Sequence, residues 1–231
     1  MTKDFCVISF YTENSLYEKD VRDLVASCQK LKIPYIIEKV PNLGSWEKNC
    51  CFKPKYILEK LQALKKAVVW VDADAILVQK PKIFPLSCDV AAYKRHLNIK
   101  GKKVEMIQSG TLFVNYTKKA IELLKKWEKA CQKKLREEEK KKKPKEVWDQ
   151  ECLNDLLKKE KSVIFEKLPL GYCRVFDYQY EEISMEETFI LHFQASRFTK
   201  PLVGDPDEIS FLQNIDSIDL KFMRFHIPDT I

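Results

Sequence analysis

Two carboxylates interrupt an apolar stretch in the first half of the chain. In "AVVWVDADAILVQKP", residues 67–81, one alanine separates Asp72 from Asp74, and apolar residues flank the pair on both sides. Unpaired carboxylates in apolar surroundings are costly, and a bound divalent cation commonly offsets that cost. A cation held by few protein oxygens keeps coordination positions open for phosphates. The pattern indicates a metal–diphosphate site, with a polar turn after a strand as the simpler alternative.

Strand patterns alternate with helix patterns on either side of this pair. Strands are predicted near residues 5–12, 34–40, 67–71, 87–93, 109–117, 162–168 and 188–193, and helices over 14–31, after Pro54, from about Thr117 and from about Asp149. Ser15 and Glu18 have capping-box spacing at the start of the first helix. The alternation predicts one α/β domain, residues 1–231, with a mixed, mostly parallel central sheet flanked by helices. Ligands bind beyond the carboxyl ends of such strands, where Asp72 and Asp74 lie.

Length and composition exclude several classes of protein. A chain of 231 residues with 45% apolar residues can bury a substantial core. No segment reaches the ~18 consecutive apolar residues that a membrane span needs. The eight cysteines show no CxxC spacing, so neither a zinc site nor a disulfide scaffold is indicated. We therefore expect a soluble, cytoplasmic protein.

Four segments in order resemble the motifs of one enzyme family. They are "VDADAIL", "MIQSGTLFVNYTKKA", "WDQECLNDLL" and "ILHFQASRFTKP". Together they resemble the GT-A fold nucleotide-diphospho-sugar glycosyltransferases, most of all the retaining glycogenin-type and bacterial galactosyltransferase families. The resemblance implies a Rossmann-like GT-A domain that moves a sugar from a nucleotide donor, usually a UDP-sugar, to an acceptor. It also implies that the transfer retains the anomeric configuration, which the residues alone do not determine.

The resemblance assigns a metal site. Asp72 and Asp74 would hold Mn²⁺ or Mg²⁺, and His192, which follows a predicted strand, would be the third ligand. A nitrogen ligand beside two carboxylates favours Mn²⁺. Without the resemblance, a lone histidine after a strand is more often structural.

By the same resemblance, the donor site is predicted to have two parts, one that binds the base and one that binds the sugar. Tyr11 and Thr12, at the end of the first strand, would contact the base, and Lys53 would face the donor phosphate or sugar, whereas Asn49 fits an ordinary loop better. The sugar site would gather polar residues and one glycine that lets the backbone approach a ligand: Asp89, Gln108, Ser109, Gly110, Asp149 and Gln150. Asp149 and Gln150 are the predicted catalytic residues, although their place at a helix start also suits helix capping.

The last motif departs from the family pattern. Ala195 stands where the family has glycine, and Phe198 stands at the family's lysine. Arg197 and Lys200 are the nearest cations, so either is a candidate for the donor phosphate.

The positive charge is concentrated in one segment. Residues 118–145 contain 13 Lys or Arg and five Glu, whereas the rest of the chain is nearly neutral. This segment predicts an amphipathic helix followed by a basic extension, and the region 205–231 is a tail of mixed character. A solvated extension is the simplest interpretation of the lysines. Docking to an anionic membrane surface is the first functional alternative and nucleic acid the second.

Two other functions fit parts of the pattern. A Mg²⁺-dependent phosphohydrolase of the haloacid dehalogenase type also uses two aspartates after a strand, but it places them on the first strand. A non-catalytic binding module on a glycosyltransferase fold is the second alternative. The acceptor and the identity of the sugar are open at this point.

Overall fold

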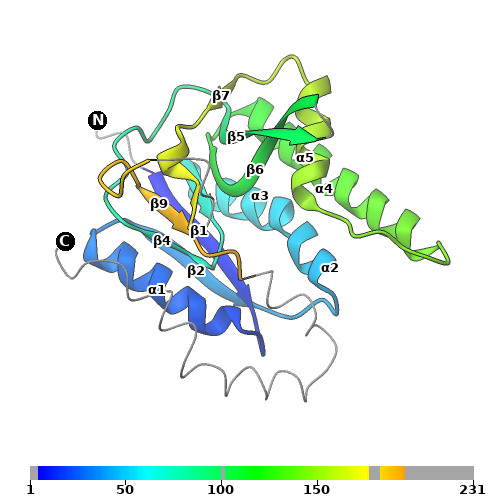
Figure 1. Cartoon of the computed structure of the whole chain (residues 1–231), viewed down its shortest axis with the longest axis horizontal. Helices are drawn as coiled ribbons and strands as arrows, with labels where there is room; N and C mark the ends of the chain where they lie inside the picture. The colour runs from blue at the N-terminus through cyan, green and yellow to red at the C-terminus, as the bar shows by residue number, and fades with distance from the viewer. Residues whose placement is uncertain (1–4, 100–101, 177–182, 196–231) are drawn as a thin grey trace.

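The computed structural model describes residues 5–99, 102–176 and 183–195 (Figure 1). Six strands form the central sheet in the order β2-β1-β3-β6-β5-β7. Their bounds are β1 Phe5–Thr12, β2 Tyr35–Val40, β3 Ala67–Val71, β5 Val90–Ile99, β6 Lys102–Val114 and β7 Phe165–Lys167. Strand β6 runs antiparallel to both of its neighbours, and the other three pairings are parallel. The mixed, mostly parallel sheet is confirmed.

A small second sheet lies at the carboxyl end of β3. It pairs β4 (Ala75–Leu77) with β9 (Ile190–His192), and β9 with β8 (Arg174–Val175). In the antiparallel β4–β9 register, Ala75 is opposite His192. A histidine more than a hundred residues away in the sequence is thereby held beside the two aspartates.

Helices cover both faces of the central sheet. Their bounds are α1 Tyr17–Lys30, α2 Trp46–Cys51, α3 Lys53–Leu64, α4 Lys118–Glu139 and α5 Asp149–Lys159, with a short 3-10 turn at Leu170–Tyr172. In Figure 1, α4 and α5 lie beside the β5–β6 hairpin, on the other side of the molecule from α1.

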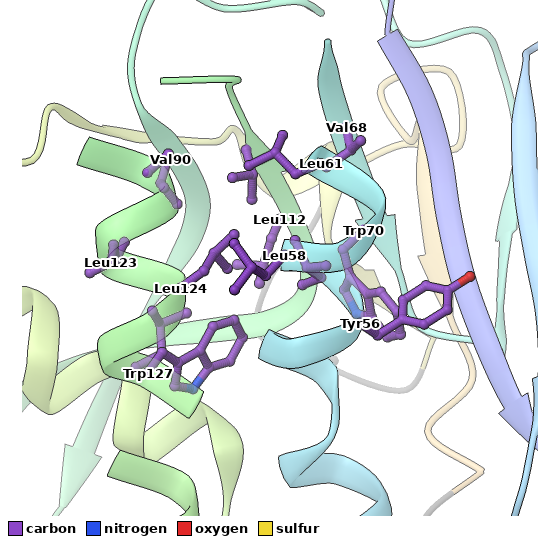
Figure 2. Close-up of a cluster of buried hydrophobic side chains, with 14 of the residues drawn as sticks. Tyr56, Leu58, Leu61, Val68, Trp70, Val90, Leu112, Leu123, Leu124 and Trp127 are labelled. Carbon is purple, nitrogen blue, oxygen red and sulfur yellow. The ribbon is translucent and has the colours of Figure 1, made fainter. Parts of the chain in front are cut away.

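Strand alternation divides the core into two clusters. Cys6, Ile8 and Phe10 point into the cluster that α3, α4 and α5 cover, whereas Phe5 and Val7 point toward α1. Figure 2 shows the first cluster, in which Leu58 of α3, Leu124 and Trp127 of α4, and Trp70 of β3 point toward one another. Because side chains alternate along β1, one face of the strand packs toward α3, α4 and α5, and the other packs toward α1.

The first helix begins without the predicted capping box. Leu16 is its N-cap and makes no side-chain cap. The Glu18 carboxylate instead accepts a hydrogen bond from the backbone N–H of Asn14 at 2.9 Å, and the Ser15 hydroxyl donates to the Thr12 carbonyl at 2.6 Å. Both side chains therefore hold the turn after β1 instead of capping the helix.

The basic helix forms as the pattern predicts. Thr117 caps α4 by accepting from the Ala120 N–H, and Ala120, Leu123, Leu124 and Trp127 are buried. Residues 140–146 beyond it are exposed. Among the described helices, none combines the length and apolar character that crossing a bilayer requires. All eight cysteines are free thiols, and all but Cys50 are buried.

Candidate functional site

A cleft opens beyond the carboxyl ends of β1 and β3. The predicted site residues that line it are Tyr11, Thr12, Lys53, Asp72, Asp74, Gln108, Ser109, Gly110, Asp149, Gln150 and His192. They come from strands, loops and helix starts far apart in the sequence. The cleft is the place where a sheet of this kind binds its ligands.

Asp72, Asp74 and His192 form the candidate metal triad. Their nearest ligand atoms all lie within 4.8 Å of one another. Asp72 directly follows β3, Asp74 precedes β4, and His192 ends β9 opposite Ala75. Two carboxylates and an imidazole at this separation suit a small divalent ion such as Mn²⁺.

Each member of the triad has a second partner that orients it. The Trp70 indole N–H donates to Asp72 Oδ1 at 2.8 Å, and the Ala195 N–H donates to Asp74 Oδ2 at 2.6 Å. His192 Nε2 lies 2.8 Å from the Thr111 hydroxyl. The other oxygen of each carboxylate and His192 Nδ1 are left as ligand atoms, as expected when outer partners fix the ligands of a metal.

Gly110 leaves the space in which the triad assembles. A Cβ at this position would lie 3.0 Å from His192 Cε1, 3.2 Å from His192 Nδ1 and 3.3 Å from Asp72 Oδ2. The Gly110 carbonyl also accepts the backbone N–H of Asp72 at 2.9 Å. The sequence predicted that this glycine would let the backbone approach a ligand, and the structure adds that it makes room for the histidine and the aspartate.

Burial shifts the pKa values of Asp74 and His192. Burial and the neighbouring Asp72 charge raise the pKa of Asp74 to about 7. Burial lowers the pKa of His192 to about 4, so its imidazole is neutral at pH 7 and able to act as a ligand. A buried carboxyl that resists ionisation and a neutral histidine fit a site completed by a cation, because the cation would favour the ionised aspartate.

Lys53 joins this triad to the predicted catalytic residues. Its ammonium lies 3.0 Å from Asp72 Oδ1 and 3.2 Å from Asp149 Oδ2, and its side chain is only 7% exposed. It also donates to the carbonyl and hydroxyl of Ser109, each at 3.3 Å. Burial opposes the charge on Lys53, but the two carboxylates outweigh it and raise its pKa. The lysine is therefore a fixed positive charge at the centre of the cleft.

Asp149 and Gln150 face the cleft from the start of α5. The N-cap of this helix is Trp148, and no side chain caps it, so Asp149 does not serve as a helix cap. The Trp127 indole donates to the Asp149 carbonyl at 2.8 Å and fixes the start of the helix. Gln150 Oε1 accepts from the Ser109 N–H at 3.1 Å. The simpler interpretation of these two residues as helix-capping groups is thereby corrected.

Tyr11 and Thr12 lie at the end of β1, on the rim of the same cleft. The Thr12 hydroxyl is buried and donates to Ser15 Oγ at 3.0 Å. Asn49 also lines the cleft, but its amide accepts from the Leu43 N–H at 2.8 Å and donates to Asn42 at 3.1 Å. These bonds close the loop before α2, in keeping with a structural role for Asn49.

One predicted donor contact lies apart from the cleft lining, and two others fall on residues that the structure does not describe. Asp89 is not among the residues that line the cleft. Its carboxylate accepts from the Thr117 hydroxyl at 2.6 Å and from the Ile164 N–H at 2.8 Å, tying the start of α4 to the segment before β7. These two hydrogen bonds give Asp89 a structural role at that junction, and its contact with a donor sugar stays a prediction. Arg197 and Lys200 lie outside the described residues.

Two tryptophans at the cleft were missed from the sequence. Trp46, the first residue of α2, and Trp148, directly before Asp149, both line it. The only sequence signal was the position of Trp148 beside the Asp-Gln pair. Trp46 carries no signal, because nothing in a single sequence places α2 beside α5.

Solved structures with a similar fold include glycosyltransferases. A glycosyltransferase involved in the glycosylation of the major capsid of PBCV-1 matches with a TM-score of 0.60 and 13% identity, covering 92% of this chain and 99% of that one. The glycosyltransferase GlyE of Streptococcus pneumoniae TIGR4 matches with a TM-score of 0.53 and 17% identity over 96% of this chain. The chain spans 62% of the length of GlyE. No family model and no curated protein sequence matches. At these identities the likeness shows the fold.

Proposed function

We propose that this protein is a metal-dependent glycosyltransferase with a GT-A fold, which moves a sugar from a nucleotide-diphosphate donor to an acceptor. The observation that carries the proposal is the chain of contacts Asp72–Lys53–Asp149. It links a metal-ligand triad to a polar helix start within one cleft. A diphosphate leaving group needs its developing negative charge neutralised, and this cleft concentrates the groups to do so.

The donor would lie with its diphosphate against the triad and its base at the end of β1. Asp72, Asp74 and His192 would hold Mn²⁺ or Mg²⁺, which when bound supplies positive charge to the diphosphate. Tyr11 and Thr12 line the rim where the base would stack and hydrogen-bond, and the family resemblance favours uracil. Gln108 and Ser109 would contact the sugar, and Gly110 leaves the space that the triad requires.

Lys53, Asp149 and Gln150 would act at the sugar. The Lys53 ammonium fixes the orientations of both Asp72 and Asp149, so the two ends of the donor site are held in one geometry. We infer that Asp149 binds sugar hydroxyls and that Gln150 lies beside the anomeric carbon. The Gln150 side-chain oxygen accepts from the Ser109 N–H, which fixes the amide before substrate binds.

We infer that the transfer retains configuration. The bond from the anomeric carbon to the diphosphate oxygen breaks, and the acceptor oxygen bonds to the same face. The acceptor proton passes to the leaving phosphate oxygen. An inverting reaction would need a carboxylate base on the acceptor side. Of the acidic side chains lining the cleft in the described part of the chain, Asp72 and Asp74 belong to the triad and Asp149 is paired with Lys53.

The experiment that tests the proposal needs no acceptor. Purified protein is incubated with a panel of UDP-, GDP-, ADP- and TDP-sugars in Mn²⁺, and the slow release of free sugar is measured. At least one donor, a UDP-sugar in our proposal, should be hydrolysed, and EDTA should stop the reaction. Hydrolysis of p-nitrophenyl phosphate in place of every sugar donor would favour a phosphohydrolase, and no metal-dependent nucleotide binding would favour a binding module.

Once an acceptor is known, the product decides the stereochemistry. An α-linked donor should give an α-linked product by proton NMR coupling. Gln150→Ala should lower kcat at least tenfold while changing the donor KM less, because the proposed contact strengthens in the transition state. A β-linked product would contradict retention and leave the fold assignment intact.

A solvated extension remains the simplest interpretation of the basic segment 118–145, and docking to an anionic membrane surface is the functional role that we propose to test, ahead of nucleic acid. Lys140, Lys142 and Lys143 are exposed beyond α4. Lysines near an anionic bilayer contribute about 1 kcal/mol each to binding. The protein would then work in the cytoplasm, peripherally at a membrane.

A further inference from the structure

Two tryptophans form an aromatic corner beside the proposed reaction centre. Trp46 at the start of α2 and Trp148 directly before α5 both line the cleft. Their ring centroids are 5.3 Å apart, with the planes at 72°, so the edge of one ring meets the face of the other. Trp46 is buried at 9% exposure, whereas Trp148 is 36% exposed. The buried ring thus supports a partly open one.

The exposure of Trp148 is unusual within this molecule. Among the described residues, the exposed large hydrophobic side chains are Leu43, Tyr116, Trp148 and Ile164. Trp148 alone of these four lines the cleft. An indole face left partly open to water on the wall of a cleft is available to stack on a bound ligand, while its N–H can still hydrogen-bond.

The position of Trp148 relative to the donor indicates what would bind there. Asp149 follows it directly and contacts Lys53, which contacts Asp72 of the triad. The Trp148 carbonyl accepts the Cys152 N–H at 3.3 Å, and Trp127 anchors the Asp149 carbonyl, so the start of α5 is fixed. Trp148 therefore adjoins the proposed sugar site through Asp149, and Lys53 lies between that aspartate and Asp72 of the triad that would hold the diphosphate. The acceptor must approach that sugar site.

The chemistry of an indole face favours one class of acceptor. Its negative π surface attracts the weakly positive C–H groups that one face of a pyranose presents, while the hydroxyls at the sugar's edge remain available for hydrogen bonds. Gln150 is the next polar side chain after Asp149 in the cleft and can serve such a hydroxyl. We propose that Trp148, supported by Trp46, is the acceptor platform and that the acceptor is itself a carbohydrate. This inference rests on the proposed function and specifies its substrate class.

The test uses the UDP-sugar that the wild-type protein hydrolyses. Methyl glycosides of glucose, galactose, mannose and N-acetylglucosamine are offered as acceptors beside Ser-, Thr- and Tyr-containing peptides and phospholipid vesicles. We expect transfer to at least one glycoside. Trp148→Ala should raise the acceptor KM at least tenfold with a change of less than twofold in the donor KM, and Trp148→Phe should raise the acceptor KM less than threefold because it keeps an aromatic face.

Two further variants separate stacking from folding. Trp148→Leu keeps an apolar contact to Trp46 without the ring and should behave like Trp148→Ala, so the test survives if the alanine variant folds poorly. Tyr116→Ala removes an exposed aromatic side chain that does not line the cleft and should leave both KM values unchanged. Saturation-transfer NMR with Mg²⁺ and UDP should show contact to the C–H protons of one glycoside face in wild type and in Trp148→Phe, and not in Trp148→Leu.

The outcomes distinguish this inference from the proposed function. If donor hydrolysis occurs but only peptides or lipids accept the sugar, or if Trp148→Leu leaves the acceptor KM unchanged, the carbohydrate platform is overturned and the glycosyltransferase remains. If wild type neither binds nor hydrolyses any nucleotide sugar, the proposed function fails and this inference fails with it.

Discussion

The cleft and the basic helix contain the same charged residue types and use them in opposite ways. In the cleft, Lys53 is 7% exposed and lies within 3.2 Å of two carboxylates. On α4, Lys133 is 75% exposed and pairs with Glu137 at 3.8 Å. Buried charges depend strongly on their partners, whereas exposed pairs contribute little because water screens them. Position in the fold, rather than residue type, therefore decides which lysine matters to the site.

The largest expected effect on donor binding comes from the triad. Asp74→Asn should abolish Mn²⁺-dependent UDP binding, measured by calorimetry, because it removes a ligand charge. Asp72→Asn should do the same. The free energy of unfolding should stay within about 1 to 2 kcal/mol of wild type, since neither change opens a cavity. UDP affinity that is indifferent to EDTA and to both substitutions would contradict the metal site.

The next effect compares the two lysines directly. Lys53→Met should lower the free energy of unfolding by about 3 kcal/mol, because it leaves the buried Asp149 carboxylate without its cation, and donor hydrolysis should be lost. Lys133→Met is the matched control, and it should change stability by less than about 1 kcal/mol. Urea denaturation measures the free energy of unfolding of both variants. Equal losses of stability would contradict the claim that the cleft lysine depends on its partners more than the helix lysine does.

A smaller effect should follow pH. Because the pKa of Asp74 is raised to about 7, a proton must leave this carboxyl before a cation binds, so Mn²⁺ affinity should fall as pH drops below 7. His192, with a pKa of about 4, stays neutral over this range and adds nothing to the pH dependence of Mn²⁺ affinity. Between pH 7 and pH 6 the affinity should fall up to about tenfold. A flat profile from pH 8 to pH 6 would show that Asp74 is ionised throughout.

The smallest effect on the chemistry is expected from the basic extension. Replacing Lys140 through Lys143 with Gln should leave donor hydrolysis unchanged, because these residues do not line the cleft. Binding to phosphatidylserine vesicles should weaken at least tenfold, and its salt dependence should become shallower. Vesicles of phosphatidylcholine alone are the control. Lost hydrolysis would place the extension in the catalytic site.

The local order of the fold was predictable from the sequence. Alternating apolar residues define β1, and the stripe of Leu123, Leu124 and Trp127 defines the buried face of α4. Both patterns depend on neighbours a few residues apart, which one sequence displays fully. The aspartate pair at the end of β3 was predictable for the same reason. The capping box at Ser15 did not form, because the local turn after β1 engages the Ser15 and Glu18 side chains instead.

Assembly of the site across distant segments was decided by the tertiary structure. Pairing of β4 with β9 brings His192 to Asp74, and packing of α3 against the sheet inserts Lys53 between Asp72 and Asp149. Asp89 looked equivalent to these residues in sequence, yet Thr117 and Ile164 bind its carboxylate away from the cleft. The family resemblance predicted His192 as a metal ligand. No spacing in the sequence predicts that Trp46 and Trp148 contact each other. Residue types and short spacings determine which chemistry a segment can perform, and contacts between segments determine which side chains share one site, because those contacts fix distance and burial together.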